Sequence, residues 1–369
     1  MTPGSLDSAT AAVAIGRNEG ERLRLCLESL VGRAAAVVYV DSGSTDASVE
    51  LARSLGVEVV ELDLSQPFTA ARARNEGFAR LQEILPAVQY VQMVDGDCEV
   101  VDGWLDTAAA ALAADDKLAV VCGRRRERHP DASIYNRLCD MEWDTPVGPA
   151  RSCGGDALFR AAALTQIGGY DPTVIAGEEP ELCVRLRQAG WRIERLDAEM
   201  TLHDAALTRF GQWWKRNVRA GHAYAQGAAM HGKTDGHNVK QVRSILVWGL
   251  VAPLLTLAAL AAAAVELALR PGWVLWVFWL AVFFVNLSMF VQLSYRIQRY
   301  RRSRGDAPLD ASVYARFTVL GKLANAAGVL QYRKNRLLNR RAEIIEYKSA
   351  ARPGPTLGER GLRPTEGAS

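Results

Sequence analysis

Short apolar runs alternate with segments of helical periodicity over the first 240 residues. The runs at 11–16, 35–40 and 56–62 have the length and the β-branched content of strands, and amphipathic helices are expected near 20–30 and up to residue 55. Strands that alternate with helices are typical of βαβ units, in which the strands pair in parallel. We therefore predict an α/β domain over residues 11–240, with a mostly parallel sheet flanked by helices.

Two long apolar stretches follow this domain, at 245–265 and 273–293. Each has about the ~20 residues that a helix needs to cross a bilayer. Trp273, Trp276 and Trp279 are typical of a membrane interface. A buried helical hairpin of a soluble domain is the alternative, but it accounts less well for the uninterrupted apolar length. We predict two transmembrane helices that form a hairpin over 245–293.

Positive charge is unevenly distributed around the two stretches. The short connection between them carries only Arg270, whereas Lys240 and Arg243 precede the first stretch. Further arginines follow the second stretch, namely Arg296, Arg299, Arg301, Arg302 and Arg304. Because positively charged flanks stay on the cytosolic side, we predict a multi-pass protein of the inner cell membrane whose α/β domain faces the cytoplasm.

A basic segment over 296–350 follows the hairpin and contains an amphipathic pattern. Its apolar positions recur at helical spacing, at Val313, Phe317, Leu320 and Ala324. Lys322 and Asn325 are expected on the opposite face. The pattern predicts a helix that lies on the membrane surface, although a helix packed against the globular domain fits it too. Residues 1–10 and the Pro- and Gly-rich tail 351–369 are expected to be disordered.

Composition limits the functions to consider. The net charge of +3 gives no support to a nucleic-acid partner, because binding of that kind depends on neutralising many phosphates. The six cysteines include no CxxC pair, so neither a zinc site nor a disulfide framework is expected, and reduced thiols in the cytosol fit best. The start of the chain lacks the charged residues and the apolar core of a cleaved secretory signal.

Candidate chemistry begins at residues 90–100, YVQMVDGDCEV, where an apolar run ends in Asp95 and Asp97. Two ionised carboxylates this close repel each other unless a positive group or water separates them, and a divalent cation is one such group. A simple turn is the alternative, since Asp and Gly are favoured turn residues. Asp41 follows another predicted strand, at the edge where α/β sheets bind ligands. Ligand contact and hydrogen bonding within its loop both remain open for Asp41.

These pieces, taken in order, resemble the family 2 glycosyltransferases, whose catalytic domain has the GT-A fold of nucleotide-diphospho-sugar transferases. The resemblance covers residues 13–214 and rests on the order and spacing of several short motifs rather than on any one of them. The motifs are VAIGRNEG (13–20), VDSGSTD (40–46), ARNEG (73–77), VDGDCE (94–99), CGGDALFR (153–160), IGGYDP (167–172) and GEEPELCVRLRQAGWRIE (177–194).

The resemblance implies a donor site for a nucleotide sugar, UDP- or GDP-linked. In this family the D-x-D pair holds Mg²⁺ or Mn²⁺ on the donor diphosphate, so Asp97 is the expected direct ligand and Asp95 the expected ribose or water-mediated contact. Oxygen ligands suit both metals. Further residues match the family's nucleotide pocket: Asp41 at the base edge, Arg74 at the base or phosphate, and Asn18 and Glu19 along the pocket wall.

The resemblance also implies a catalytic carboxylate. The family's ED-x-x-L-x-x-R helix corresponds to Glu178 and Glu179, with glutamate in the place of the aspartate. Glu179 is the favoured general base and Glu178 the second choice. The alternative is that both acids only complement a helix N-terminus. His203 is a candidate third metal ligand, with a structural role left open.

Two further segments match parts of the family that surround the acceptor. Gly154, Gly155 and Asp156 correspond to the loop that borders the acceptor and the donor sugar. The run QWWKR (212–216) is similar to the Q-x-x-R-W signature of processive polysaccharide synthases, but the match is imperfect. We expect Trp213 and Trp214 to lie at the bilayer surface near the acceptor, with ordinary helix packing as an equal alternative.

The predicted function is therefore transfer of one sugar, with inversion, to a membrane lipid or a lipid-linked or glycan acceptor, as in cell envelope polysaccharide assembly. Two spans are too few for the polymer channel of a processive synthase. A membrane assembly subunit that binds a nucleotide sugar without turning it over is the other alternative, because of the glutamate at position 179. The sequence indicates no oligomeric state.

Overall fold

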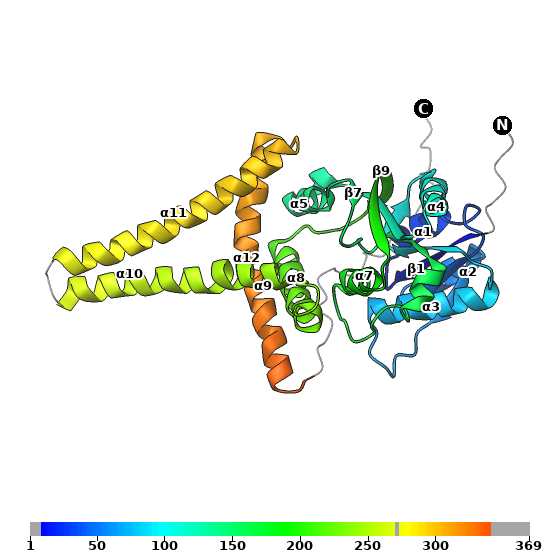
Figure 1. Cartoon of the computed structure of the whole chain (residues 1–369), viewed down its shortest axis with the longest axis horizontal. Helices are drawn as coiled ribbons and strands as arrows, with labels where there is room; N and C mark the ends of the chain where they lie inside the picture. Colours follow the sequence, from blue (N-terminus) through cyan, green and yellow to red (C-terminus); the bar gives the residue numbers. More distant parts are fainter. Residues whose placement is uncertain (1–8, 270–272, 341–369) are drawn as a thin grey trace, which may run out of the picture.

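The computed structural model describes residues 9–269 and 273–340, with side chains placed for all of them except 273–276. Several expectations concern parts of the chain outside this range, namely Arg270, the side chains of Trp273 and Trp276, the first residues of the chain and the tail. Figure 1 shows an α/β domain from which two long helices project side by side, with a third long helix crossing near their base.

The α/β domain begins with β1 (Thr10–Gly16), α1 (Glu21–Glu28), β2 (Val37–Asp41), α2 (Ser48–Ser54), β3 (Glu58–Glu61), α3 (Ala70–Ile84), β4 (Tyr90–Asp95), β5 (Cys98–Val100), α4 (Trp104–Ala114) and β6 (Leu118–Glu127). It continues with η1 (Pro130–Ala132), α5 (Ile134–Trp143), β7 (Gly148–Pro149), β8 (Ala157–Arg160), α6 (Ala161–Gln166), α7 (Glu178–Gln188) and β9 (Arg192–His203). The helical part comprises α8 (Phe210–His231), α9 (Val239–Leu246), the π-helical η2 (Val247–Val251), α10 (Ala252–Leu269), α11 (Trp273–Ser303) and α12 (Pro308–Leu337).

The sheet is mixed. Within the described residues its strand order is β3-β2-β1-β4-β8-β6-β9-β5, and β7 pairs with β9. The first four strands are parallel, as predicted from the βαβ pattern. The other half departs from a parallel arrangement, since β8 is antiparallel to both of its neighbours and β5 is antiparallel to β9. The predicted strands and helices near the N-terminus are confirmed to within a few residues at their ends.

The carboxyl ends of the parallel strands meet at one edge of the sheet. Gly16 at the end of β1 is in register with Asp41, and Ile15 is in register with Asp95. The chain order of the strands reverses between β1 and β4, because β2 and β3 lie on one side of β1 and β4 on the other. A reversal of this kind opens a crevice beyond the strand ends, where α/β sheets bind their ligands.

The helix α3 packs closely enough on this sheet to need a glycine. A Cβ atom at Gly77 would lie 2.4 Å from Cγ1 of Val13 and 2.8 Å from Cγ2 of Val40. Both valines are buried in the main hydrophobic core. This close approach places Arg74, one turn earlier on the same helix, beneath the carboxyl edge of the sheet.

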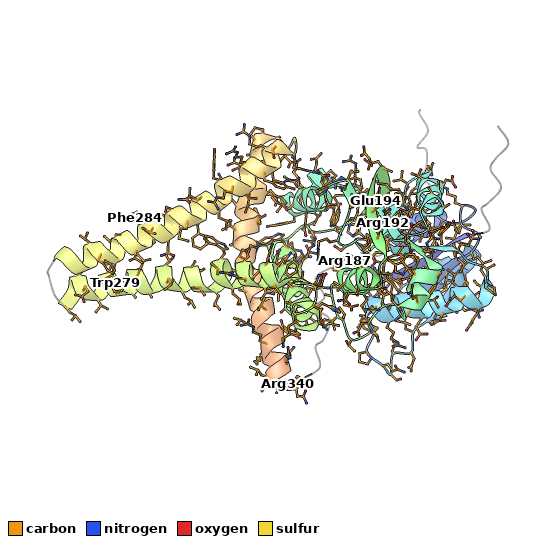
Figure 2. The ribbon with its side chains drawn as sticks, in the orientation of Figure 1. Arg187, Arg192, Glu194, Trp279, Phe284 and Arg340 are labelled. Atoms are coloured by element: carbon orange, nitrogen blue, oxygen red, sulfur yellow. The ribbon has the colours of Figure 1, made fainter. Side chains whose placement is uncertain are left out.

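The two projecting helices are long and apolar. Residues Val239–Leu269 form one continuous helical segment that contains an 18-residue stretch with a mean hydropathy of 2.3, and Val277–Ser303 contain one with a mean hydropathy of 1.9. The predicted span 245–265 lies within the first segment, and 273–293 lies within α11. Phe284 is 60% exposed, and Figure 2 shows Phe284 and Trp279 on the projecting hairpin, away from the α/β domain. Outward-facing apolar side chains disfavour a buried hairpin of a soluble domain and support a membrane anchor.

The helix α12 packs against α8 and η2 through glycines. A Cβ atom at Gly221 would lie 2.0 Å from the carbonyl oxygen of Asn325, and one at Gly249 would lie 2.0 Å from that of Lys322. The expectation that Asn325 faces away from the packed side is wrong, since this residue is only 9% exposed. Because α8 and η2 have glycines at the contact, the backbone of α12 comes close to both of them. The packed face of α12 therefore includes polar residues, which a pattern of apolar positions does not identify.

The contact between α8 and α12 predicts the cost of an added methyl group. Gly221→Ala should lower the free energy of unfolding by about 1–3 kcal/mol, because the new carbon overlaps the Asn325 carbonyl. Thermal unfolding of the full chain in a mild detergent measures the change. The matched control is Gly211→Ala on the same helix, where the new carbon meets nothing within 4 Å. Equal midpoints for the two variants would contradict this packing.

Candidate active site

A buried arginine lies at the centre of the site. Arg74 of α3 is 1% exposed. Its Nη2 lies 2.7 Å from Oδ1 of Asp95 and 2.9 Å from Oε1 of Glu179, and its Nη1 lies 2.8 Å from Oε1 of Glu178. Burial alone would lower the pKa of Arg74, but the surrounding carboxylates raise it well above its usual value. A single guanidinium therefore joins the end of β4 to the start of α7.

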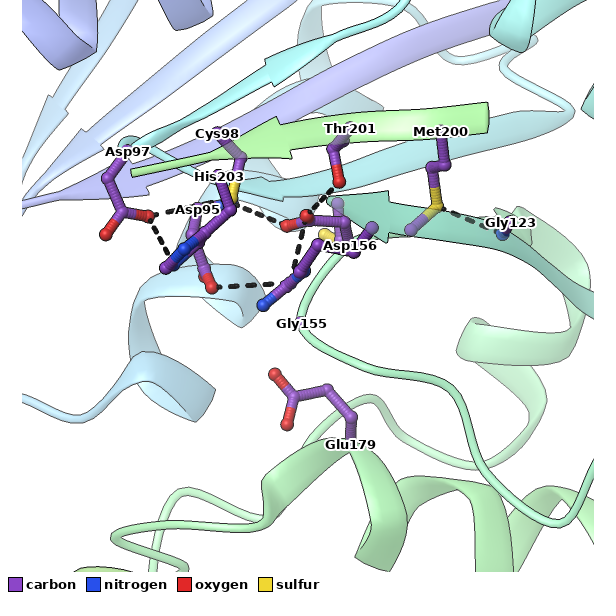
Figure 3. Close-up of polar contacts among 12 residues, drawn as sticks. Asp95, Asp97, Cys98, Gly123, Gly155, Asp156, Glu179, Met200, Thr201 and His203 are labelled. Atoms are coloured by element: carbon purple, nitrogen blue, oxygen red, sulfur yellow. Dashed lines mark hydrogen bonds and ion pairs between the residues drawn. The ribbon is translucent and has the colours of Figure 1, made fainter. Parts of the chain in front are cut away.

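Glu179 lies in the first turn of α7 and is 8% exposed. Burial and the charge of Glu178 raise the pKa of its carboxyl to about 7, against the lowering effect of Arg74. Figure 3 shows its carboxylate directed toward the loop that carries Gly155 and Asp156. A carboxyl that ionises near pH 7 can both accept and release a proton under physiological conditions.

Asp97 and His203 form a second group beside the first. They are brought together because β5 pairs with β9, where Cys98 is in register with His203. Nε2 of His203 lies 3.5 Å from Oδ1 of Asp97. Figure 3 marks this contact with a dashed line. Burial lowers the pKa of His203 well below its usual value, so its ring is neutral at pH 7 and has a lone pair to offer.

This second group fits a divalent metal by the chemistry of its donors. Asp97, Cys98 and His203 offer ligand atoms that lie within 4.8 Å of one another. Burial raises the pKa of the Cys98 thiol well above its usual value, which leaves it protonated and a poor ligand for a hard cation. The carboxylate and the neutral imidazole are the usable donors. The sequence left both a metal-binding and a structural role open for His203, and metal binding stays a prediction.

The loop before β8 supports the end of β4. Asp156 is fully buried and accepts hydrogen bonds from the backbone NH of Asp95 at 3.2 Å and from Oγ1 of Thr201 at 2.7 Å. A Cβ atom at Gly155 would lie 2.7 Å from Oδ2 of Asp95, whereas one at Gly154 would have 4.0 Å to its nearest neighbour. The backbone of the loop therefore lies close to Asp95 at Gly155, where a side chain would not fit. Contact of these three residues with a sugar stays a prediction.

The Asp41 carboxylate is hydrogen-bonded to residues of its own strand and loop. Its carboxylate accepts hydrogen bonds from the Tyr39 hydroxyl at 2.9 Å, from the Gly43 NH at 2.9 Å and from the Ser44 NH at 2.8 Å. The side chain is 3% exposed. Loop support, one of the two roles that the sequence left open, is therefore present, and contact with a nucleotide base stays a prediction.

Asn18 and Glu19 lie on the loop after β1, beside the Asp41 loop. Oδ1 of Asn18 accepts a hydrogen bond from the Thr45 NH at 2.7 Å, and the Asn18 NH donates to Oγ of Ser44 at 2.9 Å. Asn18 has a φ of 56°, a left-handed conformation that asparagine tolerates better than most residues. The carboxylate of Glu19 pairs with Arg22 at 2.8 Å. Both residues flank the crevice at the strand ends, and their contact with a nucleotide stays a prediction.

Trp213 and Trp214 lie on α8, apart from the carboxylates. Trp213 is 4% exposed, and its ring centroid lies 5.1 Å from that of Phe317 and 5.5 Å from that of Phe210. Trp214 is half-buried and packs at 5.8 Å from Phe210. Helix packing, the alternative that the sequence left open, is present at Trp213, which contacts α12, whereas the Trp214 ring contacts a residue of its own helix. An acceptor contact remains a prediction.

Two residues of the site were missed by sequence reasoning, and both come from β6. Nη2 of Arg125 lies 2.9 Å from Oδ2 of Asp156 and 3.8 Å from Oδ2 of Asp95. Oε2 of Glu127 lies 3.7 Å from Nδ1 of His203, where a carboxylate can orient a metal-binding imidazole. The only available signal was the presence of charged residues in an otherwise apolar strand, CGRRRE, which does not indicate their partners.

Comparisons with known proteins agree with this geometry. Residues 13–150 match the family described as Glycosyl transferase family 2. The "Pre-mycofactocin glycosyltransferase" of Mycobacterium tuberculosis is 26% identical over 245 residues, which cover 63% of this chain and 50% of that protein. The "Succinoglycan biosynthesis protein ExoA" of Rhizobium meliloti is 28% identical over 210 residues, which cover 53% of this chain and 64% of that protein. The chain thus spans about half to two thirds of the length of these curated relatives.

A solved structure supports the fold over most of the chain. A mannosyltransferase from Pyrobaculum calidifontis, in complex with GDP-Man and Mn²⁺, superposes with a TM-score of 0.56 and 17% identity, covering 89% of this chain and 88% of that one. Residues 13–150 are thus similar to glycosyl transferase family 2, and the α/β domain has the GT-A fold.

Proposed function

We propose that this protein is an inverting glycosyltransferase. It moves a sugar from a nucleotide-diphosphate donor, UDP- or GDP-linked, to a hydroxyl or phosphate of a membrane-associated acceptor that is lipid-linked or a glycan. The observation that carries the proposal is the meeting of Asp95 and Glu179 at one guanidinium, at the carboxyl edge of a GT-A sheet. This edge is where such sheets bind nucleotides.

The donor diphosphate is assigned to the side of the site that holds Asp97, Asp95 and His203. Mn²⁺ or Mg²⁺ held by Asp97 and His203, with Asp95 nearby, would neutralise charge on the departing nucleoside diphosphate. The mannosyltransferase of the same fold was solved with GDP-Man and Mn²⁺, which is the class of donor and metal proposed here. The buried Glu127, 3.7 Å from Nδ1 of His203, is the carboxylate that would orient this ring on a bound metal.

Glu179 is assigned as the general base. The acceptor oxygen attacks the anomeric carbon and loses its proton to the Glu179 carboxylate, while the bond from that carbon to the phosphate oxygen breaks and its electron pair leaves with the diphosphate. One displacement inverts the configuration at the anomeric carbon. Arg74 positions the base, because its Nη2 contacts both Glu179 and Asp95.

The acceptor is assigned to the membrane because the catalytic edge and the hairpin are connected through α8. Oε1 of Glu181, in the first turn of α7, lies 2.9 Å from Nε2 of His231 at the end of α8. The chain then enters the apolar helix Val239–Leu269. The basic residues around the hairpin support an inner-membrane location with the catalytic domain in the cytoplasm.

A second candidate is a nucleotide-sugar-binding subunit without turnover. Its support is the glutamate at position 179, which differs from the family's aspartate and is engaged by Arg74. A processive polysaccharide synthase is less well supported, because the described residues contain two candidate spans. Turnover of a donor separates the first two candidates directly.

The donor experiment uses the full chain purified in a nonionic detergent. With Mn²⁺ and a panel of UDP- and GDP-sugars, the wild type should release nucleoside diphosphate from one donor, and Asp97→Asn should reduce the rate by about 100-fold or more, because a ligand of the metal is lost. Asp102→Asn is the matched control, since the Asp102 side chain is 84% exposed and pairs only with Arg33 in a surface contact. Equal rates for Asp97→Asn and wild type would reject the metal assignment.

The pH dependence of the reaction tests the base. The rate should rise as the pH increases through about 7 and then level off, because the Glu179 carboxylate must be ionised to take a proton. Glu179→Gln should remove both the activity and this rise. Glu179→Asp, which restores the residue of the family, should keep measurable activity with a rising limb. A wild-type rate that stays constant between about pH 5 and pH 9 would exclude Glu179 as the base, because this range extends about two pH units to each side of the expected pKa.

The same carboxyl should also affect stability. Its pKa is raised in the folded protein from 4.5 to about 7, so the folded state incurs no penalty below pH 4.5, and the penalty grows as the pH rises to about 7. At pH 8, the free energy of unfolding of Glu179→Gln, measured with a denaturant, should therefore exceed that of wild type by up to about 3 kcal/mol. At pH 4.5 the two free energies should be equal. Glu76→Gln, on the exposed side of α3, is the control. A gain of equal size at both pH values would contradict the raised pKa.

A further inference from the structure

A cavity rich in arginine lies on the side of β6 opposite Arg125. It has a volume of about 460 Å³ and is walled by β6, β9, the loop after α5 and the end of α11. Neighbouring side chains of a strand point to opposite faces. Arg125 therefore contacts Asp156 in the active site, while Arg124 and Arg126 line the cavity.

Three of the four arginines that line this cavity share one carboxylate. Asp144 is shared by Arg304 at 3.1 Å, Arg195 at 3.8 Å and Arg124 at 4.0 Å. Asp140 takes a further contact from Arg124 at 3.1 Å. Burial alone would raise the pKa of Asp144, but the three arginines lower it below its usual value. Asp144 is thus shared by three guanidinium groups, whereas Arg126 has Glu199 as its own partner at 2.7 Å.

Arg195 has a donor without an acceptor. The residue is 4% exposed, and its Nη1 is buried with no hydrogen-bond partner among the residues that the structure describes. Its Nε donates only a long hydrogen bond to the Gly123 carbonyl, at 3.4 Å. The Nε of Arg304 lacks a hydrogen-bond partner within the same described ranges. A buried charged donor without an acceptor is costly, so these groups indicate that an anion completes the cavity.

We propose that this cavity binds a phosphate group. A phosphate presents several acceptor oxygens, and the planar forks of Arg195, Arg304 and Arg124 match them better than a single carboxylate does. Arg304 follows the basic end of α11, on the side of the predicted span 273–293 that the sequence places in the cytoplasm. The phosphate comes from a lipid headgroup or from free phosphate, and the chemistry of recognition is the same for both.

This site goes beyond the proposed function, because it needs neither the metal nor the sugar donor. It is connected to the active site through one loop. Asp144 follows Trp143, whose ring centroid lies 4.6 Å from that of His203. The same ring lies 5.5 Å from the guanidinium carbon of Arg125. A phosphate held beside Asp144 is therefore adjacent to the wall of the candidate metal site.

The experiment measures phosphate binding by the full chain in a nonionic detergent, with EDTA present and no nucleotide, so that the donor site holds no metal-bound anion. Inorganic phosphate and a short-chain phosphatidic acid are titrated separately by calorimetry, with a short-chain diacylglycerol as the phosphate-free lipid. Arg195→Gln and Arg304→Gln should each weaken binding by about tenfold or more, since each removes a charged hydrogen-bond donor. Arg304 lies outside the sheet, so its variant tests the site even where Arg195→Gln does not fold.

Two further variants sharpen the result. Asp144→Asn should tighten phosphate binding, because it removes the carboxylate that competes for the three guanidinium groups. Arg53→Gln should leave binding unchanged, since Arg53 forms an exposed pair with Glu61 at the far edge of the sheet. Tighter binding of phosphatidic acid than of inorganic phosphate identifies the lipid as the source, and the reverse identifies free phosphate.

The proposal is overturned if neither phosphate probe binds, or if Arg304→Gln binds both of them as tightly as wild type does. Because no sugar donor is present, this outcome is independent of donor turnover. If the wild type binds phosphate but does not turn over any sugar donor, only the proposed function is rejected. If it turns over a donor but does not bind phosphate, only the proposed phosphate site is rejected.

Discussion

The active site depends on one buried positive charge held among carboxylates from two distant parts of the chain. Arg74 joins Asp95 at the end of β4 to Glu178 and Glu179 at the start of α7. Without this guanidinium, the carboxylates would repel one another in a site with little water, and a buried unpaired charge is strongly destabilising. Arg74 therefore holds Asp95, on the side of the crevice proposed to bind the sugar donor, next to Glu179, the proposed base.

The rest of the molecule holds the two sides in place around this contact. On the sheet side, Gly77 lets α3 pack directly on β1 and β2, and Gly155 lets the loop before β8 reach Asp95. On the helical side, α7 is bound to the end of α8 by the pair of Glu181 with His231, and to the segment after α8 by the pair of Arg187 with Asp235 at 2.7 Å. Since α8 also packs on α12 and leads into the apolar hairpin, the candidate base is connected to the membrane anchor by a short series of contacts.

Local sequence patterns account for much of the fold and for less of the site. Alternation of apolar runs and amphipathic segments predicts the parallel strands, and uninterrupted apolar length predicts the hairpin, because both signals depend on neighbouring residues. The motif residues Asp95, Asp97 and Glu179 could be named, and so could Arg74 and His203, but the contacts among them could not be predicted. Arg74 and Glu178 are 104 residues apart, and nothing in the chain between them encodes their contact. The same limit applies to Arg125 and Glu127, and to Asn325, whose burial depends on a glycine on another helix.

The most direct measurement is anomalous diffraction at the manganese edge from crystals of the full chain grown with Mn²⁺ and a nucleoside diphosphate. The account predicts a single strong peak in contact with Asp97 and His203, next to the bound diphosphate, with the Arg74 side chain still bridging Asp95 and Glu179. A manganese peak elsewhere, or an Arg74 side chain displaced from both carboxylates when metal and nucleotide are bound, would contradict it.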